Sequence, residues 1–342
     1  MFFWSKICNR SLGNLLYLIE KGYKGDVIMT TLADVANEAN VSKMTVSRVI
    51  NHPDQVTDEL KALVFQAMQK LNYRPNIAAK ALASNKTQVI KLFILEEMSN
   101  VEPHYMNLMM GLSRALSQKQ YSLQLMTNKN FDIGGCDGYV ITGMRDKDYE
   151  WIGRLEKPVV LYGENNYGYD FVDINNQAGG ELATNYALSC GYQRIVFVGI
   201  NLREPFEYSR ERGYLKVMQQ HLLEPEIVRI NNHSHTSEAK ISQLWEKYPK
   251  KTVFVCASDR LAVGVERAIQ NKGGKIPEDY GVIGYDGVFL DKVASPQLTT
   301  IKQDIVNLGE ICGEMLLKKI SQKGQKQGFK LIEPTLIKRG TT

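Results

Sequence analysis

Between positions 29 and 85, apolar residues recur at the three- and four-residue spacing of short amphipathic helices, with polar turns between them. Asn40 follows the first apolar group, and asparagine is one of the few non-glycine residues that tolerate the positive φ of a tight turn. Ser42 can cap the second helix and Thr57 the third, while Pro75 stops the third helix. The pattern therefore predicts a helix-turn-helix with a supporting third helix, over residues 32–39, 43–51 and 58–74.

The second predicted helix, KMTVSRVIN, has two chemically different faces. One face carries Val46, Val49 and Ile50 at core spacing. The opposite face lacks the Glu–Lys pairs of an ordinary solvated helix. It carries Lys43, Met44, Ser47, Arg48 and Asn51. In a helix-turn-helix the second helix enters the DNA major groove, so this face is a candidate for reading bases.

Each side chain near this face matches a chemical group of DNA. Arg48 and Lys43 can donate to guanine O6 and N7, and Met44 can touch a thymine methyl group. Thr45 and Ser47 suit phosphate oxygens, and Asn51 suits adenine or phosphate. A solvated helix of a small bundle remains the alternative. Seven Lys and Arg against five Asp and Glu in residues 29–88 give a net charge of only +2.

Residues 76–87, NIAAKALASNKT, contain helix formers for about two turns. An isolated helix of this length is mostly unfolded in water, so it needs a surface on which to fold. A paired copy from a second subunit, packed in a minor groove, would let Leu82 act as a wedge between base pairs. The alternative is a flexible linker with a helical tendency.

From Val89 to about Gly340 the pattern changes to strand-like apolar runs separated by amphipathic helices. This alternation predicts parallel sheets covered by helices on both faces, arranged as two sheets with a cleft between them. The runs are 89–95, 121–126, 138–142, 158–163, 194–199, 252–258 and 280–286. Ligands of such sheets bind beyond the carboxyl ends of the strands.

Polar residues follow several of these runs. Carboxylates, amides and a guanidinium can together bind the vicinal hydroxyls of a sugar, and Arg210 lies at a loop-to-helix junction where it can take part. For each residue the alternative is a helix N-cap or a hydrogen bond at a strand end. The candidates are Asp173, Asn175, Arg210, Ser258, Asp259 and Asp286.

The composition bounds the class of protein. A chain of 342 residues with 44% hydrophobic residues can form two or three domains with sizeable cores. Five cysteines without a CxxC pair, and no apolar run of membrane-spanning length, suit a cytoplasmic protein without membrane contact. His233 and His235 form an HxH without a third metal ligand, which favours an ordinary loop. No metal or cofactor is expected.

The first 28 residues do not resemble part of the fold, and no small-residue cleavage site follows their apolar stretch. Lys24-Gly25-Asp26 can be back-translated as a purine-rich ribosome-binding sequence just before the Met29 codon. We therefore expect translation to start at Met29, with residues 1–28 a non-native extension. N-terminal sequencing of the native protein decides this.

The chain resembles the LacI/GalR family of bacterial transcription regulators from Met29 to about Gly340. The residues that carry the resemblance are TLADVANEANVSKMTVSRVIN, VTDELKALVFQAMQKLNYRPNIAAKALAS, NQAGGELATNYALSCGYQRIVFVG, SRERGY, ASDRLAVGVERAI, VIGYDG and PQLTTIKQDIVNLG. The family fold is an N-terminal helix-turn-helix domain joined to an α/β periplasmic-binding-protein-like core of two doubly wound parallel-sheet subdomains. The implied domains are 29–75 for DNA binding, 76–88 for the hinge and 89–342 for the effector-binding and dimerisation core.

The resemblance also implies partners. A homodimer would bind a near-palindromic DNA operator and repress carbohydrate-utilisation genes, under control of a small effector, usually a sugar. For some members a phosphorylated carrier protein is a further partner. The DNA-contacting candidates are Thr31, Ser42, Lys43, Met44, Thr45, Ser47, Arg48, Asn51, Asn76, Ala79 and Leu82. The effector-binding candidates are Tyr105, Asn175, Arg210, Ser258, Asp259, Asp286 and Gln303.

Three positions depart from the family pattern. His104 stands where an aromatic residue often follows the proline, and Ile174 stands where many members carry a pocket aspartate, with Asp173 next to it. The ten residues 128–137, NKNFDIGGCD, join two strands where the family has a full helix. A parallel crossover with its helix needs about a dozen residues, so we expect an exposed apolar patch or a compensating contact there.

Two other classes of protein share parts of the pattern. A sugar-binding protein of the transport type has the same core, but it needs a secretory signal and has no use for the helix at 43–51. A nucleotide-dependent α/β enzyme needs GxGxxG or GxxxxGK[ST], which the sequence lacks. No nucleophile–base pair is recognisable either, so no enzymatic activity is expected.

Overall fold

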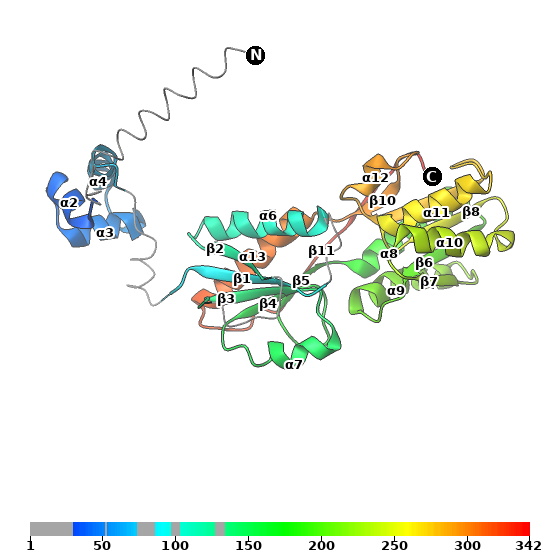
Figure 1. Cartoon of the computed structure of the whole chain (residues 1–342), viewed down its shortest axis with the longest axis horizontal. Coiled ribbons are helices and arrows are strands. Elements are labelled where there is room, and N and C mark those ends of the chain that lie inside the picture. Colours follow the sequence, from blue (N-terminus) through cyan, green and yellow to red (C-terminus); the bar gives the residue numbers. More distant parts are fainter. Residues whose placement is uncertain (1–29, 52, 74–85, 97–102, 127–133) are drawn as a thin grey trace, which may run out of the picture. The chain divides into compact units, whose positions relative to one another are not determined.

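A computed structural model describes residues 30–51, 53–73, 86–96, 103–126 and 134–342. The chain divides into two compact units, Met1–Lys80 and Ala81–Thr342 (Figure 1). The N-terminal 28 residues and the hinge candidates Asn76, Ala79 and Leu82 lie outside the described residues. The predictions made for them therefore stay predictions.

The first unit contains the three helices that the apolar spacing predicts. Its core is formed by buried side chains at these spacings, among them Val35, Val46, Val49 and Val64. The helices are α2 (Leu32–Glu38), α3 (Lys43–Asn51) and α4 (Asp58–Lys70), with a 3₁₀ turn η1 (Pro53–Gln55) before α4. Because these side chains meet at the centre, the helix-turn-helix and its supporting helix form one packed unit.

Capping explains where these helices begin. Thr31 and Asp34 form a capping box at the start of α2, and the Ser42 hydroxyl accepts from Thr45 N at 3.0 Å at the start of α3. Thr57 caps α4, as predicted. The turn after α2 contains Asn40 with a φ of 50°, which confirms the predicted tight turn.

Helix α4 ends earlier than predicted, at Lys70 rather than at Pro75. Asn72 adopts a φ of 48°, and Tyr73 N donates to Met68 O at 2.9 Å. This left-handed turn satisfies the last carbonyls of the helix before the chain reaches the proline.

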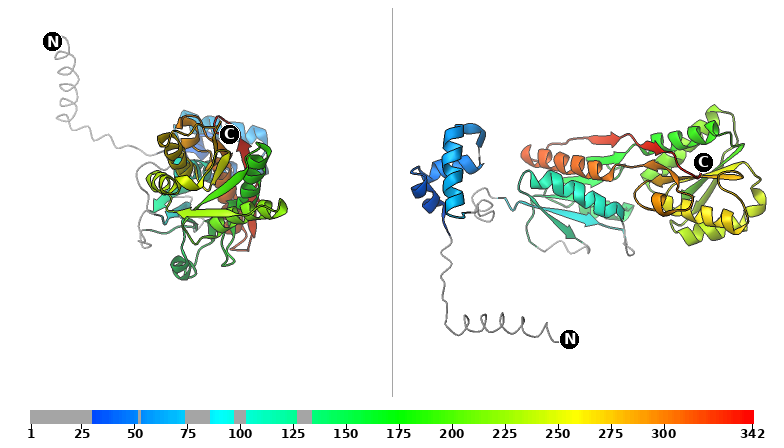
Figure 2. Two further views of the ribbon diagram at one scale, coloured as in Figure 1. Left: turned by 90° about the vertical axis from the view of Figure 1, so that its right-hand side faces the viewer. Right: turned by 90° about the horizontal axis from the view of Figure 1, so that it is seen from above.

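The second unit consists of two lobes, each built on a six-stranded sheet (Figure 2). The first lobe has the order β11-β5-β4-β3-β1-β2, all parallel. Its strands are β1 (Val89–Ile94), β2 (Ser122–Met126), β3 (Gly138–Thr142), β4 (Val159–Tyr162), β5 (Phe171–Ile174) and β11 (Phe329–Ile332). Helices α6 (Pro103–Ser117) and α13 (Ile305–Ser321) pack on one face of this sheet, and the short α7 (Tyr149–Ile152) packs on the other.

The second lobe has the order β12-β10-β9-β8-β6-β7, with only β12 antiparallel. Its strands are β6 (Arg194–Ile200), β7 (Glu226–Ile230), β8 (Thr252–Cys256), β9 (Tyr280–Asp286), β10 (Thr299–Lys302) and β12 (Thr335–Ile337). Its helices are α8 (Asn176–Ser189), α9 (Pro205–Gln220), α10 (Ser234–Gln243), α11 (Asp259–Asn271) and α12 (Leu290–Val293). The predicted fold of two parallel-sheet subdomains is confirmed, and all seven predicted strands are present.

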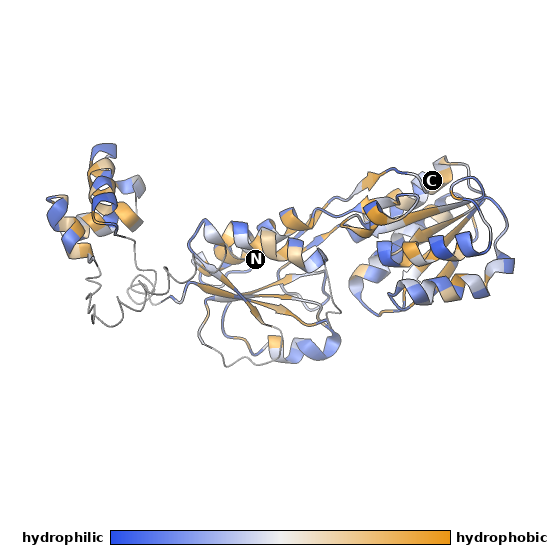
Figure 3. Cartoon of the chain, turned by 45° about the horizontal axis from the view of Figure 1, so that its top comes forward, coloured by the Kyte–Doolittle hydropathy of each residue, from blue (hydrophilic) through white to orange (hydrophobic). Residues whose placement is uncertain are grey.

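Hydropathy along the strands explains this success. Six of the seven predicted strands are mostly buried, while β2 has two exposed residues of five. Figure 3 shows the strands of both sheets as mostly hydrophobic ribbons between amphipathic helices. The unpredicted strand β11 has three exposed residues of four, and β12 is also largely accessible. Edge strands of this kind lack the continuous apolar run that marks a buried parallel strand.

The chain passes between the lobes three times: from β5 to α8, from β10 to α13, and from β11 to β12. Each passage leaves a strand at its carboxyl end. The carboxyl ends of the two sheets therefore face the region where the lobes are joined, which is the position predicted for a ligand cleft.

The short connection before β3 behaves in part as predicted. Its described residues, 134–137, contain no helix, and residues 127–133 lie outside the description. Lys91, in the middle of β1, is only 1% exposed, and its ammonium donates to Gly134 O at 2.7 Å. This is a compensating contact of the expected kind, because the lysine stem covers part of the sheet that a crossover helix would cover.

Candidate functional site

The exposed face of α3 is the candidate DNA interface. Val46 and Val49 are buried against the other helices, as the sequence predicts. Lys43, Met44 and Arg48 are exposed, and Met44 keeps 71% of its surface accessible although it is a large apolar residue. Ser42, Lys43, Met44 and Arg48 thus occupy one accessible surface that begins at the N-terminus of the helix, with Thr45 and Ser47 half-buried beside them.

Electrostatics distinguish this face from the rest of the unit. On the other helices, Lys61 pairs with Asp58 and Lys70 pairs with Glu38, each at 2.7 Å. Lys43 and Arg48 form no ion pair with any described residue. Exposed cations beside an exposed methionine suit a polyanionic surface that also presents methyl groups, as a DNA major groove does. Thr31 is committed to capping α2, since its hydroxyl accepts from Asp34 N.

The segment that enters the core is anchored by Asp137. Its carboxylate accepts from Thr87 N at 2.9 Å, from Thr87 Oγ1 at 3.0 Å and from Gln88 N at 3.0 Å. Asp137 directly precedes β3, so the chain leaving the DNA-binding unit is fixed to the sheet of the first lobe. The sequence analysis missed this residue, whose only signal is a carboxylate just before a strand.

In the cleft region, Arg210 is the central cation. It is 7% exposed, its Nε donates to Asn176 Oδ1 at 2.8 Å and its Nη1 donates to Ala257 O at 2.6 Å. The guanidinium lies 3.8 Å from the Tyr285 ring centroid and 5.1 Å from that of Phe206. Hydrogen bonds and two neighbouring aromatic rings therefore hold this buried guanidinium in one place, where it can serve as a charged hydrogen-bond donor.

Asp286 lies at the end of β9 in a strained conformation, with a φ of 123°. Gln303 supports it twice, because Gln303 N donates to Asp286 O at 3.0 Å and Gln303 Nε2 donates to Asp286 Oδ1 at 2.8 Å. Burial raises the pKa of Asp286 to about 6, against the attraction of Arg210. The structure thus brings Arg210, Asp286 and Gln303 together around a residue with an uncommon backbone conformation.

Ser258 and Asp259, at the start of α11, lie next to this site. Ser258 caps α11, and its hydroxyl donates to Asn232 Oδ1 at 2.7 Å. Asp259 accepts from Thr300 Oγ1 at 2.6 Å and from Gly287 N at 2.8 Å, so that both oxygens hold the strands around Asp286. Burial, reinforced by the nearby Asp286, raises the pKa of Asp259 well above its usual range.

Asn175 and Asp173 form hydrogen bonds where the chain passes from β5 to α8. Asn175 caps α8 and donates to Glu333 Oε1 at 2.8 Å. Asp173 lies inside β5 rather than after a strand, and it accepts from Ile174 N at 2.7 Å and from Glu164 N at 2.8 Å. Asp173 is also linked to the group around Arg210, because Asn176 Nδ2 donates to Asp173 Oδ2 at 3.2 Å and Asn176 Oδ1 accepts from Arg210 Nε.

Tyr105 belongs to a chain of contacts that crosses between the lobes. Its hydroxyl donates to Glu96 Oε2 at 2.5 Å, and Arg145 Nη2 donates to Glu96 Oε1 at 2.8 Å. Arg145 Nε then lies 3.5 Å from Glu204 Oε1, at the start of α9 in the second lobe. A second contact joins the lobes where Ser209 Oγ donates to Glu164 Oε2 at 2.9 Å.

Comparisons with known proteins agree with this geometry. Residues 31–76 match the family model described as bacterial regulatory proteins, lacI family, and residues 184–342 match a periplasmic binding protein-like domain. The HTH-type transcriptional regulator YvdE of Bacillus subtilis (strain 168) is 52% identical over 315 residues, which cover 92% of this chain and 100% of that protein. The chain belongs to the LacI family of bacterial regulatory proteins.

More distant relatives also match this chain over nearly its whole length. The ribose operon repressor of Haemophilus influenzae is 29% identical over 91% of this chain and 98% of its own length. A transcriptional regulator CelR–cellobiose complex and a lac repressor dimer bound to operator both have a TM-score of 0.70 at 24% identity. Both structures cover 92% of this chain, and the match includes 100% of the first structure's chain and 99% of the second's. The similarity shows a shared fold.

Membership confirms two predictions. A LacI-family chain with this helix-turn-helix is a DNA-binding transcriptional regulator, and the family consists of regulators rather than enzymes. The described residues hold no group of three metal-binding side chains, and the rings of His233 and His235 simply stack at 5.4 Å. In the described part of the chain, no helix has the length and apolarity needed to cross a membrane.

The sequence analysis of this LacI-family chain missed several cleft residues. Glu96 and Glu164 follow the predicted strands at 89–95 and 158–163, so the strand-end rule could have found them. Arg145 and Glu204 lie farther from a strand and carry no such signal. His104 approaches Tyr162, with 3.3 Å between Nε2 and the hydroxyl, and burial lowers its pKa to about 4, so it is neutral at pH 7.

Proposed function

We propose that this regulator is a dimeric repressor of carbohydrate-utilisation genes, released from or held on a near-palindromic operator by a small sugar in the cleft between the lobes. The observation that carries the proposal is the group formed by Arg210, Asp286 and Gln303 where the carboxyl ends of the strands meet the joint between the lobes. A charged donor, a charged acceptor and an aromatic face are the groups that bind sugar hydroxyls and ring C–H edges.

The proposal is supported by relatives that bind sugars or regulate sugar genes. One relative is named a ribose operon repressor, and one similar structure contains cellobiose. None of the relatives named above is described as binding a phosphorylated carrier protein, so we do not propose that partner. As a regulator that acts on bacterial DNA, the protein works in the cytoplasm.

The contacts support a coupling between the cleft and DNA binding. An effector that pairs with Arg210 and Asp286 of the second lobe and also touches the first lobe would change how closely the two lobes approach, and with it the Arg145–Glu204 contact. Because Asp137 fixes Thr87 and Gln88 to the first lobe, movement of that lobe moves the chain that leads to the DNA-binding unit. In a dimer this changes the spacing of the two hinge segments, and with it the cost of folding them on the operator.

We propose domain boundaries that follow these roles: residues 29–75 read the operator, residues 76–88 form the hinge, and residues 89–342 bind the effector and dimerise. The exposed methionines Met106 and Met110 lie four residues apart on one face of α6, and Phe289 and Val293 are exposed at α12. Large apolar side chains gathered on a surface mark an interface, and we assign them to the homodimer.

A binding assay tests the function. Fluorescence anisotropy with labelled DNA from upstream of its own operon is measured without sugar and with each of a panel of neutral sugars. Saturable, salt-sensitive binding that one sugar changes is the expected result. DNA binding that no sugar alters would contradict the sugar-responsive part. A protein that binds a sugar but no DNA would instead be of the transport type.

A further inference from the structure

A pocket of about 440 Å³ lies at the opposite edge of the first lobe from the cleft. It is bordered by Asp137 and Lys157, which precede β3 and β4, and by the last turn of α13. Because β3 and β4 are parallel, their amino ends form this edge and their carboxyl ends face the cleft. The pocket is therefore separate from the proposed effector site, and its volume is that of a small-molecule site, roughly 300–1,000 Å³.

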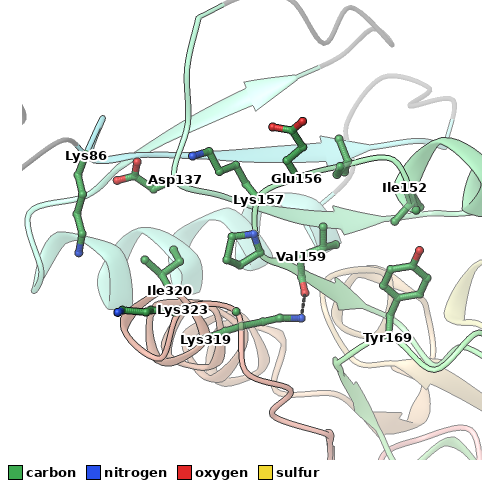
Figure 4. Close-up of a pocket in the computed structure, with 14 residues that line it drawn as sticks. Lys86, Asp137, Ile152, Glu156, Lys157, Val159, Tyr169, Lys319, Ile320 and Lys323 are labelled. Carbon is green, nitrogen blue, oxygen red and sulfur yellow. Dashed lines mark hydrogen bonds between the residues drawn. The ribbon is translucent and has the colours of Figure 1, made fainter.

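Four lysines from three separate segments line this pocket: Lys86 from the chain entering β1, Lys157 from the loop before β4, and Lys319 and Lys323 from the last turn of α13 and the turn that follows it. Figure 4 shows Lys86 and Lys323 directed to the same side of the pocket, with Lys157 above it. Lys319 is partly committed, because its ammonium lies 2.7 Å from Asp170 Oδ2 and donates to Val159 O at 2.9 Å. The other three form no ion pair with any described residue.

The acidic side chains at the pocket offset only part of the lysine charge. Asp137 and Glu156 are the two acidic residues that line it, against four lysines, and the carboxylate of Asp170 pairs with Lys319. The C-terminal dipole of α13 accounts for a cation on its last turn, such as Lys319, and Lys323 follows two residues after the helix ends. It does not account for Lys86 and Lys157, which come from other elements. The lining of the pocket therefore contains more lysines than acidic residues.

We propose that this pocket binds a small polyanion that carries phosphate groups. Lysines bind phosphate as mobile point charges, and several of them around one cavity favour a ligand with at least two negative charges over a neutral sugar. Lys86 immediately precedes Thr87 and Gln88, the residues that Asp137 fixes to the first lobe. A polyanion bound here holds that segment to the end of α13, and so acts on the link to the DNA-binding unit independently of the cleft.

Calorimetric titration of the full-length protein with inorganic pyrophosphate tests the site, at an ionic strength held constant with sodium chloride and without divalent cations. Saturable binding near one pyrophosphate per chain is expected. The double variant Lys157→Ala/Lys323→Ala loses about tenfold or more in affinity, because two of the ammonium donors are removed. The double variant Lys272→Ala/Lys275→Ala removes the same charge from exposed lysines of the second lobe and keeps the affinity of the parent protein.

Circular dichroism checks that each variant is folded. The single variant Lys157→Glu reverses one exposed charge and also weakens binding, should the double variant fail to fold. Absence of saturable binding by the parent protein overturns the proposal, as does equal binding by both double variants. In a last experiment, binding of a mixed-sequence DNA duplex is measured for the parent protein and for Lys157→Ala/Lys323→Ala. If the double variant binds the duplex more weakly and the parent protein does not bind pyrophosphate, the lysines contact DNA and the proposed small-anion site is wrong.

Discussion

The guanidinium of Arg210 lies 3.8 Å from the ring centroid of Tyr285, while its Nε and Nη1 are fixed by Asn176 and Ala257. Stacking and hydrogen bonding together leave this buried arginine a single orientation toward Asp286 and Gln303. A lysine at the same place keeps the charge but has neither the planar surface nor the fork of donors.

Arg210→Lys is therefore expected to lower affinity for the effector sugar by about tenfold or more, while operator affinity without sugar changes little. The effector is the sugar found in the anisotropy screen, and its affinity is measured by calorimetry. Arg229→Lys is the matched control, because Arg229 pairs with Glu211 on β7 and α9, at 2.6 Å. A normal sugar affinity in Arg210→Lys would remove Arg210 from the binding site.

Arg48→Ala is expected to weaken operator binding by about 1–3 kcal/mol and to relax the base preference at one position of each half-site. Arg48 is exposed on α3 and forms no ion pair with a described residue, so its charge is available to a guanine. Lys70→Ala removes the same charge from α4, where Lys70 pairs with Glu38, and serves as control. Binding is measured by anisotropy on operators with single base changes, and an unchanged base preference would contradict the assignment.

Glu207 predicts a dependence of stability on pH. It is 2% exposed and accepts from Ile200 N at 2.7 Å, and burial raises its pKa to about 7, against the attraction of Arg210. A raised pKa means that between about pH 4.5 and pH 7 the unfolded chain binds fewer protons than the folded one. The contribution of this group to the free energy of unfolding is therefore full below that window and falls as the pH rises through it.

Glu207→Gln, which stays neutral, is expected to reduce this loss of stability between pH 5 and pH 8 by on the order of 2 kcal/mol. Urea unfolding at both pH values measures it. Glu238→Gln, on the partly exposed surface of α10, is the control, and it should leave the parent's pH dependence unchanged. A Glu207→Gln profile as steep as that of the parent would show that Glu207 ionises normally in the fold.

The buried side chain of Lys91 is expected to stabilise the first sheet. Lys91→Ala should lower the free energy of unfolding by about 2–4 kcal/mol, because it leaves a cavity where the buried stem packs. Lys91→Met keeps a stem of similar length and should lose clearly less. Urea unfolding compares the two, and equal losses would mean that the hydrogen bond to Gly134 O, rather than the stem, stabilises this face.

Substitution of Met106 and Met110 tests whether α6 forms the dimer interface. The double variant Met106→Asp/Met110→Asp places two charges on the proposed dimer surface of α6 and is expected to sediment as a monomer, where the parent protein sediments as a dimer. Leu222→Asp changes a residue that is 93% exposed after α9 and should leave the mass of the parent. A dimer in the double variant would place the interface elsewhere.

The sequence by itself determined the helix-turn-helix, seven strands of which six are mostly buried, and the division into two lobes. These features depend on local periodicity: valines at helical spacing such as Val46 and Val49, and continuous apolar runs such as 252–256, report burial directly. The caps at Ser42 and Thr57 were predicted for the same reason, since a helix N-terminus is satisfied by residues next to it, whereas the capping role of Thr31 came from the structure.

The tertiary structure alone decided which polar residues share a site. Asn175, Ser258, Asp259 and Asp286 all lie at or after strand ends in sequence, but only the structure shows that Asn175 and Ser258 cap helices, that Asp259 accepts from Thr300 and that Asp286 accepts from Gln303. Arg145 and Glu204 are brought together from two lobes, and the early end of α4 depends on the turn at Asn72. Contacts between residues far apart in the chain have no periodic signature, because they are fixed by how the elements pack rather than by the spacing within any one of them.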